Sequence, residues 1–139
     1  MSFLNQLNNN RLLSGVIVNR NFSNIGFSSF DYTRHWDDHY SFKDIQIGDF
    51  IFKNLEIRIS PNGIFITFLS DDTAFYDTPI LFFETEGITV EQEPFIDKET
   101  EVKEFRRKLG AFTICGKLAR ISVLKSETYG SMIKVSFIN

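Results

Sequence analysis

Hydrophobic and polar positions alternate most regularly between residues 45 and 69, and this pattern predicts β-strands. The alternation is interrupted at Gly48 and slips again at Lys53-Asn54 before it continues through residues 55–59. Phase slips of this kind indicate bulges in a strongly twisted strand. Residues 60–63, Ser-Pro-Asn-Gly, then predict a turn, because Pro suits its second position and Asn-Gly tolerates positive φ. Residues 64–69 are the expected partner strand.

The flanking segments predict further strands and a short helix. Residues 2–8 favour a helix that ends at Asn8-Asn9-Asn10, and the β-branched run 12–18 favours a first strand. Residues 30–42 alternate around Asp37-Asp38, which favours a β-hairpin with an acidic tip, although a short helix fits the spacing almost as well. An acidic loop is expected at 70–78. Additional strands are expected at 79–83, 88–91, 117–124 and 132–138.

One longer helix is predicted at residues 98–109. Asp97 is a suitable N-cap, acids follow in the first turn, and Arg106, Arg107 and Lys108 stand in the last turn, as the helix dipole prefers. The apolar residues of this segment recur at helical spacing and indicate a buried stripe: Val102, Phe105, Leu109 and Phe112.

Many strands with one helix among them indicate an α+β fold that is mainly antiparallel β. We expect a single domain over residues 1–139, built as a compact barrel or sandwich of about six to eight strands. The C-terminal segment 132–138 would be a candidate edge strand, through which the protein could form a homodimer by strand pairing.

Composition supports a folded β-rich protein and limits its surroundings. The chain has sixteen Phe and an aromatic share of 15%, which favours packed strands. Cys115 is the only cysteine, so no internal disulfide can form, and its apolar neighbours suggest a small buried side chain. The sequence shows no apolar run long enough to span a membrane and no signal peptide, so no membrane association and a cytoplasmic location are expected.

Charge is distributed unevenly along the chain. Residues 31–97 contain fourteen acids and four bases, a net charge of −10, whereas residues 98–139 have a net charge of +5. The total of −3 therefore hides an acidic middle and a basic C-terminal third. Such an asymmetry informs about partners and not about the fold.

The acidic middle leads to the first functional hypothesis, a non-catalytic interaction protein. Aromatic residues among acids are typical of protein interfaces, and an acidic surface can occupy the phosphate site of a nucleic-acid-handling protein. An immunity protein or a mobile-element-encoded inhibitor that binds a basic protein partner through residues 31–77 would fit. The candidate contact residues are Tyr32, Trp36, Asp37, Asp38, Tyr40, Asp71, Asp72, Tyr76 and Asp77.

The basic C-terminal third leads to an alternative hypothesis, a single-stranded nucleic-acid-binding β-barrel. Its cations could follow a phosphate backbone while aromatic residues stack on bases. The acidic total charge and the absence of a known nucleic-acid-binding motif argue against it. The candidate residues are Arg106, Arg107, Lys108, Lys117, Arg120, Lys125, Tyr129 and Lys134.

A third hypothesis is a metal-dependent enzyme. His35, Asp37 and His39 combine imidazole and carboxylate ligands within five residues, but the pattern matches no known metal motif. Nucleophile elbows, phosphate-binding loops and dinucleotide-binding motifs are absent from the sequence. We therefore expect no enzymatic activity and no cofactor.

Overall fold

The structure is a computed structural model that describes residues 3–19, 32–36, 38–72, 74–77, 83, 93–96, 103–126 and 130–138. Its helices are α1 (Phe3–Asn9), α2 (Arg11–Asn19) and α3 (Ala74–Asp77). Its strands are β1 (Tyr32–Trp36), β2 (His39–Ile47), β3 (Phe50–Ser60), β4 (Gly63–Ser70), β5 (Glu93–Ile96), β6 (Lys103–Ile114), β7 (Lys117–Ser126) and β8 (Gly130–Ile138). Within these ranges no helix is long and apolar enough to cross a membrane.

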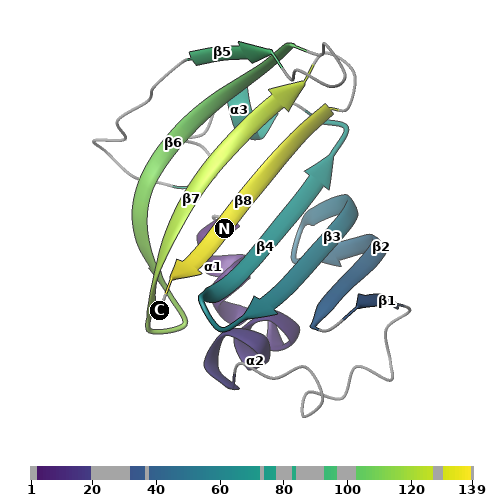
Figure 1. Ribbon diagram of the computed structural model, residues 1–139, viewed down its shortest axis with the longest axis vertical. Coiled ribbons are helices and arrows are strands. Elements are labelled where there is room, and N and C mark those ends of the chain that lie inside the picture. Colours follow the sequence, from purple (N-terminus) through teal and green to yellow (C-terminus); the bar gives the residue numbers. More distant parts are fainter. Residues whose placement is uncertain are drawn as a thin grey trace.

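All eight strands belong to one antiparallel sheet with the order β1-β2-β3-β4-β8-β7-β6-β5. Two meanders, β1–β4 and β5–β8, are joined where β4 pairs with β8. The sheet is curved, and the helices lie on one side of it, behind the strands in Figure 1. We call this the inner face and the opposite side the outer face. The mainly antiparallel α+β class is confirmed, as one curved sheet.

The prediction that residues 132–138 form an edge strand is wrong. β8 is paired along its length with β4 on one side and with β7 on the other. The edges of the described sheet are β1 and β5. A strand whose backbone groups are paired on both sides cannot recruit a second chain, so dimerisation through this segment is excluded.

The N-terminal helix is confirmed as α1, but the strand predicted at 12–18 is a second helix, α2. Asn10 caps α2, because its side-chain oxygen accepts a hydrogen bond from the N–H of Leu13 at 3.0 Å. Leu13, Val16 and Ile17 are buried, and their spacing of three and four residues is helical. The cap and this spacing outweigh the weak strand preference of the β-branched residues.

The hairpin predicted around Asp37-Asp38 is confirmed by the pairing of β1 with β2. The break at Gly48 is a turn and not a bulge: Ile47 pairs with Phe50, and Gly48 has a φ of 59°. Glycine at this position is what a two-residue type II′ hairpin requires. The slip predicted at Lys53-Asn54 is confirmed, because Phe52 and Leu55 are both buried although they are three residues apart.

The turn at 60–63 and the strand that follows it are confirmed as the β3–β4 hairpin, in which Ser60 pairs with Gly63. The strands expected at 117–124 and 132–138 are confirmed as β7 and β8. Within the loop expected at 70–78, residues 74–77 form the single helical turn α3. Of the strand expected at 79–83 only Phe83 is described, and it is helical; the strand expected at 88–91 lies outside the described residues.

The helix predicted at 98–109 is wrong for the residues described there: residues 103–114 form strand β6. A bulge between Lys108 and Gly110 changes the phase of this strand. Phe105 and Leu109 therefore face the core before the bulge and Phe112 after it, which reproduces helical spacing in a strand. The favourable interactions of charged side chains with a helix dipole contribute only about 0.3–1 kcal/mol each. Pairing of β6 with both β5 and β7 outweighs them.

The core lies between the inner face of the sheet and the helices, and Phe3 is at its centre. Its ring, which is fully buried, contacts five other phenylalanines edge-on at centroid distances of 5.3–5.7 Å. These partners come from β3, β4, α3 and the segment before β5: Phe50, Phe52, Phe68, Phe75 and Phe83. This cluster attaches α1 to the inner face and leaves the outer face exposed to solvent.

Candidate functional site

Antiparallel register places basic side chains of β6, β7 and β8 in neighbouring rows on the outer face. Lys108 pairs with Ser122, which pairs in turn with Lys134. Arg120 lies two residues from Ser122 and therefore faces the same way, and it pairs with Ser136. Paired residues on adjacent strands have their side chains on the same face. The sheet thus collects cations that are up to 26 residues apart in the sequence, as Lys108 and Lys134 are.

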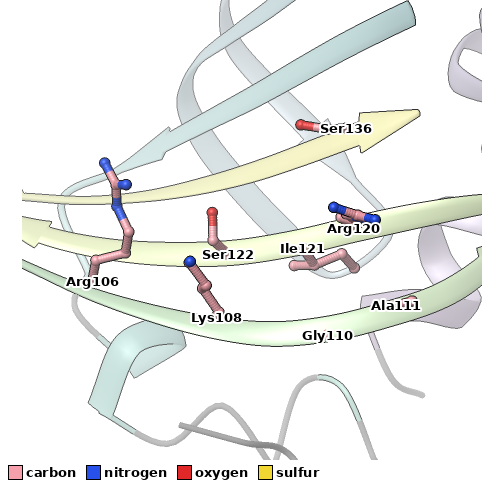
Figure 2. A pocket seen from close by; sticks show the side chains of 8 residues that line it. All are labelled: Arg106, Lys108, Gly110, Ala111, Arg120, Ile121, Ser122 and Ser136. Carbon is pink, nitrogen blue, oxygen red and sulfur yellow. The ribbon is translucent and has the colours of Figure 1, made fainter. Parts of the chain in front are cut away.

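Four of these residues, Lys108, Arg120, Ser122 and Ser136, line a hollow of about 440 Å³ on the outer face. Figure 2 shows the side chains of Arg106 and Lys108 rising from β6 beside Ser122 of β7. Arg120 and Ser136 line the same hollow from β7 and β8. Three cations and two hydroxyl groups therefore surround one depression, and all of them can donate hydrogen bonds to an anion.

Cations predominate among the described side chains of this region. Arg106, Lys108, Arg120 and Lys134 are all exposed. Among the described side chains that β6, β7 and β8 direct outward, none is acidic. The described side chains of this part of the sheet therefore contribute positive charge although the chain as a whole is acidic.

The positive region continues onto β3 and β4. Arg58 of β3 pairs with Phe65 of β4, and its guanidinium lies 4.9 Å from the centre of the Phe65 ring. A second hollow of about 250 Å³ contains Arg58, Phe65 and Lys134. His39 and Glu56 border it, with His39 Nε2 and Glu56 Oε2 3.9 Å apart. Glu56 thus marks the limit of the positive region on the β3 side.

Not every predicted basic residue belongs to this face. Arg107 faces inward, where its guanidinium lies 4.3 Å from the ring centre of Tyr76. Lys125 also faces inward and forms an ion pair with Asp77, with Nζ 3.0 Å from Oδ1. Lys117 is exposed at the β6–β7 turn, at the end of the sheet remote from Arg106. Tyr129 lies outside the described residues.

The acids of the predicted partner surface are divided between two ends of the sheet. Asp71 and Asp72 follow β4, and Asp77 lies in α3 close by. Asp38 is at the other end, where its carbonyl accepts a hydrogen bond from the N–H of Ile59 at 2.8 Å. The two ends are roughly 20 Å apart along the strands. The described acids therefore do not form one continuous surface.

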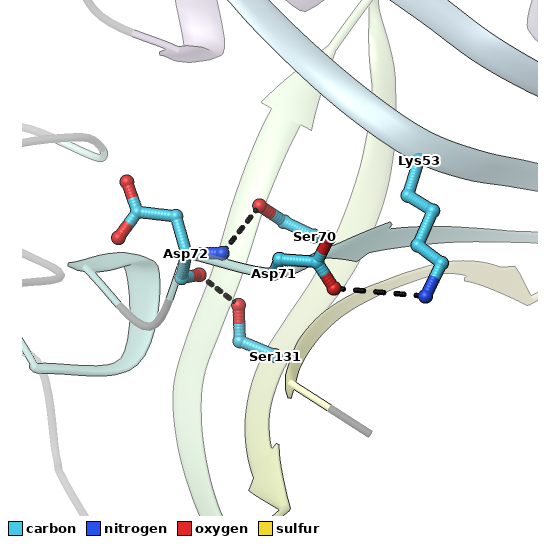
Figure 3. A network of polar contacts seen from close by, with 5 residues as sticks. All are labelled: Lys53, Ser70, Asp71, Asp72 and Ser131. Carbon is cyan, nitrogen blue, oxygen red and sulfur yellow. Dashed lines mark hydrogen bonds and ion pairs between the residues drawn. The ribbon is translucent and has the colours of Figure 1, made fainter. Parts of the chain in front are cut away.

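Internal contacts also neutralise part of the acidic set. Figure 3 shows Asp71 facing Lys53, with Oδ1 and Nζ 3.6 Å apart. The backbone of Asp72 is fixed on both sides, because its N–H donates to Ser70 Oγ at 3.1 Å and its carbonyl accepts from the Ser131 hydroxyl. The loop is thus held to β8, while the Asp72 carboxylate remains exposed.

Two of the four aromatic residues expected at that surface are buried. Tyr40 is 6% exposed and Tyr76 is 2% exposed. The side chains of Tyr32 and Trp36 and the whole of Asp37 lie outside what the structure describes. The acidic interface remains a prediction, and reversing Asp71 and Asp72 to Lys is the change that tests it.

The metal hypothesis is also left as a prediction. Within the described ranges no three His, Cys, Asp or Glu side chains cluster as metal ligands. His39 lies on the outer face beside Glu56, whereas the His35 side chain and Asp37 are not described. Cys115 is half-buried in the β6–β7 turn, and burial raises the pKa of its thiol, which makes it a poor nucleophile.

Arg58 and the outward hydroxyls of Ser122 and Ser136 are the site residues that sequence analysis did not identify. Arg58 directly follows the buried Ile57 in β3, and successive side chains of a strand point to opposite faces, so the outward direction of Arg58 was predictable. Its position beside Lys134 was not, because this depends on the pairing of β4 with β8.

The chain was compared with protein-family models, curated proteins and solved structures, and none of the three comparisons found a match.

Proposed function

We propose that this protein binds single-stranded nucleic acid through phosphate contacts on the outer face of its sheet. The observation that carries the proposal is the row of exposed cations that strand register places on the outer face across β6, β7 and β8. Arg106, Lys108, Arg120 and Lys134 are the proposed phosphate-binding residues.

The chemistry of the face suits a phosphate backbone. Arg and Lys contribute charge, and the hydroxyls of Ser122 and Ser136 are the type of uncharged donor that commonly contacts phosphate oxygens. Binding of phosphates releases condensed counterions, so that it depends on local charge and not on the net charge of the protein. Of the described acids of the 71–77 segment, Asp71 and Asp77 are paired with Lys53 and Lys125.

The test is the affinity for a fluorescently labelled single-stranded 20-mer, measured by anisotropy over a range of salt concentrations. Four phosphate contacts predict that log K falls with log salt with a slope of about −3. Lys108→Ala and Arg120→Ala should each weaken binding and make the slope less negative by about 0.7. Lys53→Ala is the matched control, since Lys53 of β3 is exposed and paired with Asp71, away from β6, β7 and β8.

The expected result is that the two outer-face variants lose affinity while Lys53→Ala does not. Salt-independent binding, or equal losses in all three variants, would show that the outer face is not the binding surface. Binding of a basic protein that is lost on reversing Asp71 and Asp72 would instead support the acidic interface.

A further inference from the structure

A mostly apolar hollow of about 270 Å³ lies on the outer face next to the cationic rows. Its apolar lining comes from three adjacent strands: Leu69 of β4, Met132 of β8 and Leu124 of β7. These residues are paired in register, Leu69 with Met132 and Met132 with Leu124. Leu124 is 6% exposed and lies deepest, whereas Leu69 and Met132 are half-buried.

Cations border this hollow on two sides. Arg106 of β6 pairs with Leu124 and so continues the cross-strand row of Leu69, Met132 and Leu124. Lys134 lies two residues beyond Met132 on β8 and is itself part of the lining. Adjacent strands are about 4.8 Å apart, and residues i and i+2 of a strand about 6.7 Å apart. Both cations are therefore within one side-chain length of the apolar surface.

We infer that this hollow binds a single unpaired nucleobase, while Arg106 and Lys134 hold the phosphates on either side of it. The inference rests on the proposed function and specifies which part of the ligand is recognised besides the backbone. A base has an apolar face that can lie on Leu and Met side chains and a polar edge that can reach the hydroxyl of Ser126 at the rim.

The size and the charge of the site select this occupant. Pockets for drug-sized molecules have volumes of about 300–1,000 Å³, so this hollow suits a fragment such as one base. In a duplex the bases are stacked and paired, and a base must leave the stack before it can enter a protein pocket. The hollow would therefore give the protein a preference for single strands, which phosphate contacts alone do not provide.

The experiment compares two labelled single strands with identical phosphates, a 12-mer of thymidine and the same length made entirely of abasic nucleotides. Both are titrated onto the full chain by anisotropy at several salt concentrations. Met132→Gln and Leu69→Asn make the hollow polar without changing its charge. Leu118→Asn is the matched control, because Leu118 is an exposed leucine (66%) remote from the hollow.

We expect the wild-type protein to bind the thymidine strand about fivefold more tightly than the abasic strand, because burial of roughly 40 Å² of apolar base surface on Leu and Met, at about 25 cal/mol per Å², stabilises the complex by about 1 kcal/mol. This preference for the thymidine strand should disappear in Met132→Gln and Leu69→Asn, while the salt dependence of binding by these two variants stays as in the wild-type protein. Leu118→Asn should keep both the preference and the salt dependence. Thermal unfolding verifies that each variant is folded.

Three other outcomes would overturn the inference in distinguishable ways. Equal, salt-sensitive binding of both strands by the wild-type protein would exclude a base site and leave the proposed function standing. No salt-sensitive binding of either strand would remove the proposed function together with the inference. Tighter binding to vesicles of anionic lipid than to either strand would assign the hollow and its cations to a lipid surface.

Discussion

The guanidinium of Arg107 lies over the ring of Tyr76, 4.3 Å from its centre. Sequence analysis assigned these residues to two different binding surfaces of opposite charge, but they contact each other on the inner face. A buried cation–π contact stabilises by about 0.5–2 kcal/mol. Within the described part of the chain, Tyr76 Oη and Arg107 Nε are buried and have no hydrogen-bond partner. The Arg107–Tyr76 contact therefore contributes to the stability of the fold, although these two buried polar atoms lack hydrogen bonds.

Replacement of Tyr76 by Phe should leave stability unchanged or raise it. The ring that Arg107 covers is kept, and a buried hydroxyl without a partner is removed, which is worth up to about 1 kcal/mol. Urea denaturation measures the free energy of unfolding. Tyr76→Leu is the comparison, since it removes the ring and should be destabilising. A loss of more than about 1 kcal/mol in Tyr76→Phe would mean that the hydroxyl does form a hydrogen bond.

Asn8→Ala should destabilise the protein by about 0.5–1.5 kcal/mol. Asn8 Oδ1 accepts a hydrogen bond from the N–H of Cys115 at 2.8 Å and so ties α1 to the β6–β7 turn. Asn9→Ala is the matched control, because Asn9 is exposed in the same helix and gains the same helix propensity. The difference in unfolding free energy between the two variants measures the contacts of the Asn8 side chain, which also donates from Nδ2 to the carbonyl of Leu4 at 2.9 Å. Equal stabilities would show that these contacts contribute nothing.

Gly130→Ala should be clearly more destabilising than Gly116→Ala. Both glycines have positive φ, 87° and 75°, which costs a residue with a side chain about 1–2 kcal/mol. A Cβ at Gly116 would meet nothing within 4 Å, whereas a Cβ at Gly130 would lie 2.5 Å from the carbonyl oxygen of Ser70. The close approach of β8 to the end of β4 is the added cost at Gly130. Thermal unfolding of both variants tests this order.

The pKa of Cys115 predicts a loss of stability at high pH. Burial raises the pKa of the folded thiol above its ordinary value of 9.0, so the folded state favours the protonated form. The resulting stabilisation is complete below pH 9.0 and is lost as the pH rises through the folded pKa. Relative to Cys115→Ser, which does not ionise, the wild-type protein should lose stability above that pH. Parallel pH profiles for both proteins would contradict this.

Nucleic-acid affinity should depend on the face of a residue and not on its segment. Arg58→Ala should weaken binding of the labelled 20-mer, although Arg58 is far from the basic C-terminal third, because its side chain shares a hollow with Lys134. Lys125→Ala should leave affinity unchanged, since Lys125 faces inward and pairs with Asp77. The opposite order in the anisotropy titration would favour a site defined by the C-terminal segment.

Local sequence determined the turns and most strands, because their signals act over a few residues. Ser60-Pro61-Asn62-Gly63 produced the β3–β4 turn, and the apolar pair Phe52 and Leu55 marked the phase slip inside β3. Period-two alternation also predicted which side chains leave the core. The α+β class dominated by antiparallel strands followed from these elements alone.

Tertiary structure decided the elements whose local signals were mixed. In β6 the bulge before Gly110 gives Phe105, Leu109 and Phe112 helical spacing, and strand pairing on both sides determined the outcome. In α2 the cap at Asn10 and packing of Leu13 outweighed a β-branched run. Intrinsic preferences differ by less than about 1 kcal/mol per residue, so burial and pairing override them.

The sequence by itself determined that this chain folds as a β-rich protein and that its basic residues lie mainly toward the C-terminus. Only the tertiary structure decided which of those residues share a surface. It directed Lys108 and Lys134 outward together and turned Arg107 and Lys125 inward toward α3. The physical reason is that the direction of a strand residue alternates along the chain, whereas its neighbours are set by register with strands distant in sequence.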